Sequence, residues 1–131
     1  MNIEEAFPKV EPGMIPVGNR VLIQIRQPKR KSKGGIIFSD DTRDTEKDVT
    51  QIAKVINLGS LAYRNNTTMD HWPEGKWCDV GSFIRIPRYI GERWSVKFGA
   101  GPDEFVTFGI VRDTDVIGVV TVDPTEIVAY V

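Results

Sequence analysis

Apolar and polar residues alternate in several short segments of this chain, and glycine, proline or aspartate separates most of them. In the first such segment, 20–27, the side chains of Val21, Ile23 and Ile25 face one side of an expected strand. Later segments with strand-like composition are 50–58, 82–86, 93–98, 104–111, 116–122 and 126–131. No convincing amphipathic helix is expected. This spacing predicts an all-β fold, a small barrel or sandwich.

One long segment breaks this pattern. Residues 29–48, KRKSKGGIIFSDDTRDTEKD, are polar except for the tripeptide Ile-Ile-Phe at 36–38, which follows two glycines. Such a composition cannot bury enough apolar surface to order itself. The three apolar residues are adjacent, so they form neither a helical stripe nor one face of a strand. Two interpretations remain open: a docking element that folds on a partner, or a surface loop with a stray apolar cluster.

Composition narrows the class of protein. The chain of 131 residues has the length of one domain, and its net charge of −1 gives no global electrostatic case for binding nucleic acid or a membrane. The single cysteine excludes an intramolecular disulfide and fits a reducing compartment. No apolar run approaches membrane-spanning length, and the acidic N-terminus lacks the order of a signal peptide. We expect a cytoplasmic protein.

Residue types that carry catalysis or bind metals are sparse. The single histidine, His71, and the single cysteine, Cys78, cannot form a four-ligand zinc site. We expect His71 to be an exposed loop residue and Cys78 a small buried one. The paired acids at 40–41 lie in a solvated loop, and Asp113 and Asp115 flank a turn, where aspartate is common. The sequence therefore predicts no catalytic residue, no metal, no cofactor and no enzyme activity.

A cluster of basic residues at 29–33 could bind the phosphate backbone of a nucleic acid. Acidic residues at 40–48 follow at once, and no aromatic residue lies among the basic ones to stack on a base. We therefore expect no binding to nucleic acid. A non-catalytic β-barrel binding module, for nucleic acid or for viral assembly, remains the alternative to the interpretation that follows.

Five segments of the chain together resemble the GroES-type co-chaperonin family. They are MIPVGNRVLI at 14–23, KGGIIF at 33–38, QIAKVINLG at 51–59, DVGSFIRIPRY at 79–89 and RDTDVIG at 112–118. The resemblance covers residues 14–123 in the family's order and spacing. The chain departs from the family at Val17, where Leu, Ile or Thr is usual, and at Ser82, where an acid is common.

The resemblance implies an irregular GroES-like β-barrel subunit that assembles into a homo-heptameric ring. Such a ring caps the nucleotide-bound ring of large chaperonin subunits and helps to enclose client proteins for folding, without binding a nucleotide itself. The single domain, 1–131, is then expected to comprise an N-terminal arm at 1–15, a mobile loop at 29–48, a candidate roof loop at 59–77 and a C-terminal extension at 124–131. Elaborated members of this kind occur in bacteriophages, which favours a viral origin and a place in the host cytoplasm.

The resemblance also assigns roles to particular residues. The expected chaperonin-binding residues are Gly34, Gly35, Ile36, Ile37 and Phe38. Tyr89 aligns with an aromatic residue that faces the interior of the dome, and the alternative for Tyr89 is a core residue at the rim of the barrel. In the family, a C-terminal strand pairs with the neighbour's N-terminal strand, which implies that 116–122 or 126–131 pairs with 21–26. The expected interface residues are Val21, Ile23, Ile25, Val116 and Val119.

Overall fold

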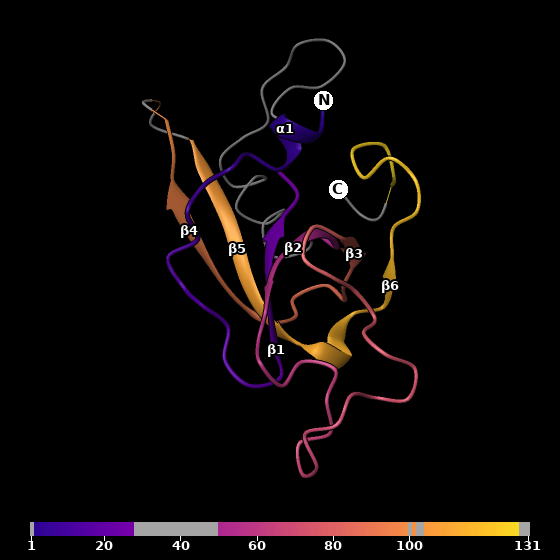
Figure 1. Cartoon of the computed structure of the whole chain (residues 1–131). Helices are drawn as coiled ribbons and strands as arrows, with labels where there is room; N and C mark the ends of the chain where they lie inside the picture. The colour runs from indigo at the N-terminus through magenta and orange to yellow at the C-terminus, as the bar shows by residue number, and fades with distance from the viewer. Residues whose placement is uncertain (1, 28–49, 100, 102–103, 129–131) are drawn as a thin grey trace.

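The structure is a computed structural model that describes residues 2–27, 50–99, 101 and 104–128. Across these residues the chain forms an antiparallel, six-stranded sheet with strand order β4-β5-β1-β2-β3-β6 and very little helix (Figure 1). The strands are β1 (Arg20–Ile25), β2 (Ile52–Leu58), β3 (Phe83–Arg85), β4 (Glu92–Lys97), β5 (Phe105–Arg112) and β6 (Gly118–Val119). The helical elements are α1 (Ile3–Ala6) and the 3₁₀ turn η1 (Asp113–Asp115). The predicted all-β fold class is confirmed.

The central strand is β1, which pairs with β5 along one edge and with β2 along the other. Val21, for example, lies opposite Leu58 of β2 and Val111 of β5. The register with β2 shifts between Leu22 and Ile23, which is a local bulge. Both edges of β1 are therefore saturated by hydrogen bonds within the chain.

The C-terminal part differs from the expectation of two full strands. Within 116–122 only Gly118 and Val119 form a strand, β6, which pairs with β3. Beyond it, Asp123 begins a turn: its Oδ1 accepts hydrogen bonds from the backbone N–H and the hydroxyl of Thr125, at 2.9 and 2.7 Å. Residues 126–128 are not in a strand, and 129–131 lie outside the described residues. Aspartate and threonine side chains readily form such local hydrogen bonds with the backbone, and these compete with the backbone hydrogen bonds of a continued strand.

The main core lies on the face of the sheet to which Val21, Ile23 and Ile25 point, as the alternation predicted. Three aromatic rings from the loop between β2 and β3 pack together beside it. Tyr63 lies 5.3 Å from Trp72 and 5.6 Å from Trp77 between ring centroids, and the two indoles are 5.2 Å apart. The remaining buried members are Ala53, Val55, Ala62, Cys78, Ile84, Ile86, Val111 and Val116. The predicted burial of Cys78 is confirmed.

The opposite face of the sheet is also apolar, and the N-terminal arm contributes to its cover. Leu22, Val106 and Phe108 are buried there, with Val10 of the arm packed against them. The arm was expected to be irregular, yet it begins with α1, whose first turn is capped by a 2.8 Å hydrogen bond from Glu5 N to Asn2 Oδ1. The arm is therefore an integral layer of the fold.

Side chains of the sheet hold the arm in place at successive points. The Nε2 group of Gln24 donates to the carbonyl of Pro8 at 2.7 Å, and the indole Nε1 of Trp94 donates to the carbonyl of Pro12 at 2.8 Å. Phe7 is buried, and its ring centroid lies 5.2 Å from that of Phe83. In Figure 1 the arm runs from α1 along the side of the sheet before it turns into β1.

Candidate functional site

The expected chaperonin-binding tip, Gly34 to Phe38, lies outside the described residues. The structure describes the two points from which this segment departs, at the end of β1 and just before β2. They are adjacent in space, since the backbone N–H of Arg26 donates to the carbonyl of Ile52 at 2.9 Å. Thr50 and Gln51 are buried at the return point. The described residues on the two sides of 28–49 therefore lie side by side, at one end of the sheet.

Residues near both ends of the described chain form hydrogen bonds with Arg26 and Gln27, the two residues that precede the undescribed segment. The backbone N–H of Gln27 donates to the carbonyl of Ala6 in α1, at 2.8 Å. The guanidinium Nη1 of Arg26 donates to the carbonyls of Pro124 and Ile127, at 2.9 and 2.7 Å. Burial lowers the pKa of the Arg26 guanidinium from its ordinary value. The end of β1, α1 and the C-terminal segment are thus joined by hydrogen bonds, and we call this joined region the platform. The sequence alone did not predict it.

Tyr89 lies between β3 and β4 and is 69% exposed, so its ring does not belong to the core. Its backbone has a φ of 60°, in the left-handed region that residues other than glycine rarely adopt. Two residues later Gly91 also has a positive φ, and a Cβ there would lie 2.6 Å from Val111 Cγ1. This tight connection holds the tyrosine ring in solvent.

Pairing with a neighbouring subunit would require a free edge on β1, and the expected interface residues on this strand do not lie at one. Val21, Ile23 and Ile25 are 0%, 0% and 2% exposed and pack in the chain's own core. Both edges of β1 are already paired, so another chain would have to displace β2 or β5 to reach it. Val116 is likewise buried, whereas Val119, on the edge strand β6, is exposed.

Exposed apolar side chains gather instead in two other places. Met14, Ile15 and Val17 are exposed in the non-strand segment that enters β1, and we call these three residues the N-terminal patch. Around and after β6, a second exposed group forms the C-terminal patch, with Ile117, Val119 and Val122 as its members. In Figure 1 the segment that enters β1 and strand β6 lie on opposite sides of the sheet. The sequence contained these residues, but their exposure follows only from the fold.

The roof-loop candidate, 59–77, has defined geometry. An antiparallel bridge joins Arg64 to His71, and the Oδ1 of Asn65 accepts hydrogen bonds from Thr67 N and Thr68 N, at 2.8 and 3.1 Å. These contacts make a short hairpin with a polar tip. His71 is exposed, as expected.

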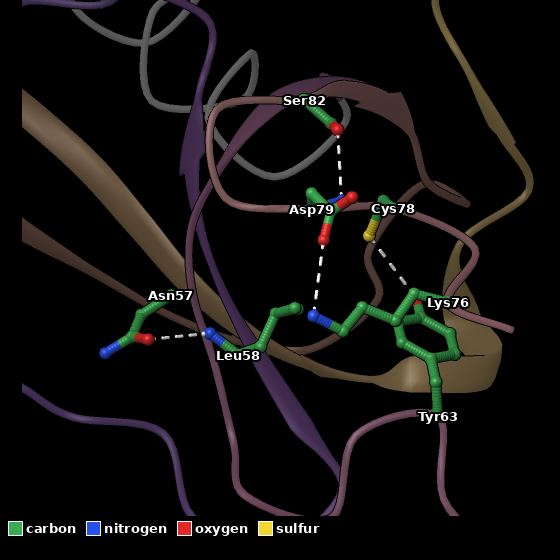
Figure 2. A network of polar contacts seen from close by, with 7 residues as sticks. All are labelled: Asn57, Leu58, Tyr63, Lys76, Cys78, Asp79 and Ser82. Carbon is green, nitrogen blue, oxygen red and sulfur yellow. Dashed lines mark hydrogen bonds and ion pairs between the residues drawn. The ribbon is translucent and has the colours of Figure 1, made fainter. Parts of the chain in front are cut away.

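A buried polar group lies at the root of this loop. The hydroxyl of Tyr63 donates to the backbone carbonyl of Asp113 at 3.0 Å and lies 3.4 Å from Cys78 Sγ. Figure 2 shows the tyrosine ring turned toward the sulfur, with Asp79 close by in its exposed ion pair with Lys76, at 3.4 Å. Burial is the main cause that raises the pKa of the Tyr63 phenol and that of the Cys78 thiol. The raised pKa keeps the thiol protonated, and a protonated thiol is a poor nucleophile.

Asp113 lies at a turn, η1, as expected, but its side chain is buried. It is 2% exposed, and its Oδ2 accepts a 3.0 Å hydrogen bond from the backbone N–H of Tyr63. Asp115 is half-buried and its Oδ2 accepts from the N–H of Arg112 at 2.8 Å. The two acids are therefore structural hydrogen-bond acceptors.

The described residues offer neither a metal site nor a membrane-spanning helix. Among residues 2–27, 50–99, 101 and 104–128, no group of three or more histidine, cysteine, aspartate or glutamate residues is placed to hold a metal ion. The same part of the chain contains no helix that is long and apolar enough to cross a membrane. The structure defines a class: a small antiparallel β-protein with a platform for a long inserted segment and two exposed apolar patches.

Comparison with known proteins supports a particular family. The model of the family described as "Chaperonin 10 Kd subunit" matches residues 13–74. A "Co-chaperonin GroES" of Oenococcus oeni is 26% identical over 104 residues, which is 79% of this chain and 96% of that protein. A "Co-chaperonin GroES" of Methylacidiphilum infernorum is 28% identical over 114 residues, 85% of this chain and 97% of that protein. These matches support the GroES-type co-chaperonin family, and the resemblance found in the sequence is confirmed.

Proposed function

We propose that this chain is the subunit of a heptameric co-chaperonin that caps an ATP-driven chaperonin ring and helps to enclose client proteins. The observation that carries the proposal is the platform at Arg26 and Gln27, together with the family match. A docking segment needs a fixed root, so that its position relative to the other subunits of a ring is defined. The platform supplies such a root for the chaperonin-binding residues 34–38.

The energetics of docking favour a ring over a single subunit. Burying the side chains of Ile36, Ile37 and Phe38 in an apolar groove contributes roughly 1.5–3 kcal/mol each. Ordering the segment around them costs about 1–2 kcal/mol per residue. One subunit therefore binds weakly or not at all. Once the first segment has docked, the others bind at high effective concentration, and avidity rises by about 10²–10⁴. Weak single contacts also allow the cap to dissociate in each cycle.

The exposed apolar patches suggest how such a ring closes. The N-terminal patch and the C-terminal patch lie on opposite sides of the subunit, and a head-to-tail contact between unlike surfaces generates a closed ring when the rotation per subunit fits. Such a contact leaves β1 paired as it is. The head-to-tail contact includes Val119, as the resemblance implied. It does not use the strand pairing that was expected at Val21, Ile23 and Ile25.

Tyr89 is proposed to face the enclosed chamber. Its ring is exposed and amphipathic, which suits transient contact with the apolar surface of an unfolded client. The bacteriophage origin and the clients stay predictions that rest on the resemblance alone.

Chaperonin binding can be tested by replacing Ile36, Ile37 and Phe38 together with serine. We expect ATP-dependent capture by an immobilised chaperonin ring to be lost, while the thermal unfolding of the co-chaperonin is unchanged. The matched control replaces Met69 and Val80, two exposed apolar residues in the described loops, with serine. Capture of the triple variant at wild-type level would refute the docking role. A general loss of folding would assign the tripeptide to the core.

Ring closure can be tested by native mass measurement. Ile15→Glu in the N-terminal patch and Val119→Glu in the C-terminal patch should each shift a heptamer toward smaller species, because a buried unpaired carboxylate opposes association. Val80→Glu introduces the same charge at an exposed turn outside both patches and should leave the ring intact. A wild-type chain that is monomeric at micromolar concentration, or patch variants that form normal rings, would contradict the proposed interface.

A further inference from the structure

A hollow of about 470 Å³ lies between the hairpin of loop 59–77 and the turn after β5. Three segments that are distant in the sequence form its walls: the turn before β1, the hairpin, and the end of β5 with η1. Its lining residues are Asn19, Arg64, Asn65, Asn66, Thr67, Trp72, Arg112, Asp113 and Thr114. The volume is larger than an inorganic ion needs, and neither the co-chaperonin role nor the ring contact uses it.

Hydrogen bonds connect the three segments that line the hollow. The backbone N–H of Asp113 donates to the carbonyl of Asn19 at 3.0 Å, and its carboxylate accepts a buried hydrogen bond from the N–H of Tyr63 at 3.0 Å. The N–H of Leu61 donates to the carbonyl of Gly18 at 2.9 Å. The three segments are thus tied to one another next to the hollow. The site exists before any ligand arrives, which lowers the cost of binding.

Cationic side chains outnumber anionic ones in the lining of the hollow. Arg64 and Arg112 bring two guanidinium groups, one of which is steadied by a 3.3 Å hydrogen bond from Arg64 Nη1 to the carbonyl of Met69. The Oδ1 of Asn65 already accepts two backbone N–H groups, so its amide can offer only its NH₂. The single carboxylate, that of Asp113, is 2% exposed and engaged by Tyr63. The charge of the lining therefore favours an anion.

Trp72 adds an apolar wall. Its indole is half-buried and is held edge-on against Tyr63, at 5.3 Å, and against Trp77, at 5.2 Å. A fixed indole beside guanidinium groups suits a ligand that combines a charged end with a flat group.

We propose that this hollow binds a small oxyanion, a phosphate or a carboxylate, that carries a flat apolar group. Arg64 and Arg112 bind the oxyanion through charge-assisted hydrogen bonds, and the flat group packs against Trp72. The inference is independent of chaperonin binding and of ring assembly, so it stands or falls separately.

The test is calorimetric titration of the full chain with phenyl phosphate, benzoate and phenol, at low salt and neutral pH. We expect the charged ligands to bind and phenol not to bind. Binding of phenyl phosphate alone, or of benzoate alone, would identify which oxyanion the site takes. The indole N–H resonance of Trp72 should shift on binding. If neither anion binds, or if phenol binds equally well, the proposal is overturned.

Two variants locate the binding. Arg64→Gln should weaken anion binding about tenfold, as expected for the loss of one charge-assisted hydrogen bond. Asn66→Asp places a negative charge at the exposed rim and should weaken binding without affecting the fold. The matched control is Asn57→Asp: Asn57 is an exposed residue of β2 that does not line the hollow, and its Oδ1 accepts a hydrogen bond from Leu58 N. Unchanged affinity in both Arg64→Gln and Asn66→Asp would place the anion elsewhere and overturn the assignment.

Discussion

Tyr63 donates two hydrogen bonds to Asp113, one from its backbone and one from its side chain. The N–H of Tyr63 donates to the Oδ2 of Asp113, and the phenol of Tyr63 donates to the backbone carbonyl of Asp113, both at 3.0 Å. The residues are 50 positions apart in sequence. This pair fixes the root of the loop between β2 and β3 to the turn that follows β5.

The first prediction concerns the carboxylate of this pair. Asp113→Ala leaves the buried N–H of Tyr63 without its acceptor and should lower the free energy of unfolding by about 1–3 kcal/mol. Asp113→Asn retains a side-chain oxygen that can accept this hydrogen bond and should cost clearly less. Urea denaturation measures both. If the two variants were equally destabilised, the hydrogen bond would not be the reason for the buried acid.

The second prediction concerns pH. Burial raises the pKa of the Tyr63 phenol above its ordinary value, so the folded chain keeps this proton longer than the unfolded chain does. The stabilisation from the neutral phenol is therefore complete below about pH 10 and declines as the pH rises above that value. We expect the free energy of unfolding to fall between about pH 9 and about pH 11 by more in the wild type than in Tyr63→Phe. Identical slopes for the two proteins would contradict the prediction.

The third prediction concerns the N-terminal arm. Phe7 is buried against Phe83, and Phe7→Ala should lower the free energy of unfolding by about 3 kcal/mol. Ile3→Ala is the matched control, because the side chain of Ile3 is 44% exposed and its loss should cost no more than about 0.5 kcal/mol. Guanidinium denaturation distinguishes them. A small effect of Phe7→Ala would show that the arm is not part of the cooperative fold.

The fourth prediction compares two glycines with similar backbones. Gly75 and Gly91 have φ values of 76° and 84°, so alanine at either costs about 1–2 kcal/mol in backbone strain. At Gly75 nothing lies within 4 Å of the added Cβ, whereas at Gly91 the Cβ meets Val111 Cγ1 at 2.6 Å and the carbonyl of Ile110 at 2.7 Å. Gly91→Ala should therefore destabilise the chain by roughly 1–3 kcal/mol more than Gly75→Ala. Similar losses at the two sites would be evidence against this steric account.

Strands that alternate strongly were predictable from the sequence. The segments expected at 20–27, 50–58, 82–86, 93–98 and 104–111 each overlap one observed strand to within a residue or two at either end, because period-two patterns with β-branched residues are typical of a half-buried sheet. The strand expected at 116–122 is shorter in the structure, because the ladder of β6 ends at Val119. Asp123 and Thr125 form a local turn shortly after it, and such side-chain hydrogen bonds carry little signal in the apolar pattern.

Two features of the candidate site were not predictable from local patterns. The arm looked irregular because its few apolar residues, Phe7 and Val10 among them, follow no period, and only the sheet they cover explains them. Asp113 was expected only as an ordinary turn residue, because the hydrogen bond that its buried carboxylate accepts comes from Tyr63, which lies far away in the sequence. In each case the partner is distant along the chain, and a local sequence pattern carries no information about it.

The attachment of Arg26 to the C-terminal segment has a consequence for how the protein is made. Arg26 donates to the carbonyls of Pro124 and Ile127, which are 98 and 101 residues further along the chain. The platform at the end of β1 therefore cannot close before residues 124–127 have been synthesised and have folded back onto Arg26. Contacts of such long range also slow the search for the native sheet. The root of the long inserted segment is therefore completed late in folding, after the strands of the sheet have been made.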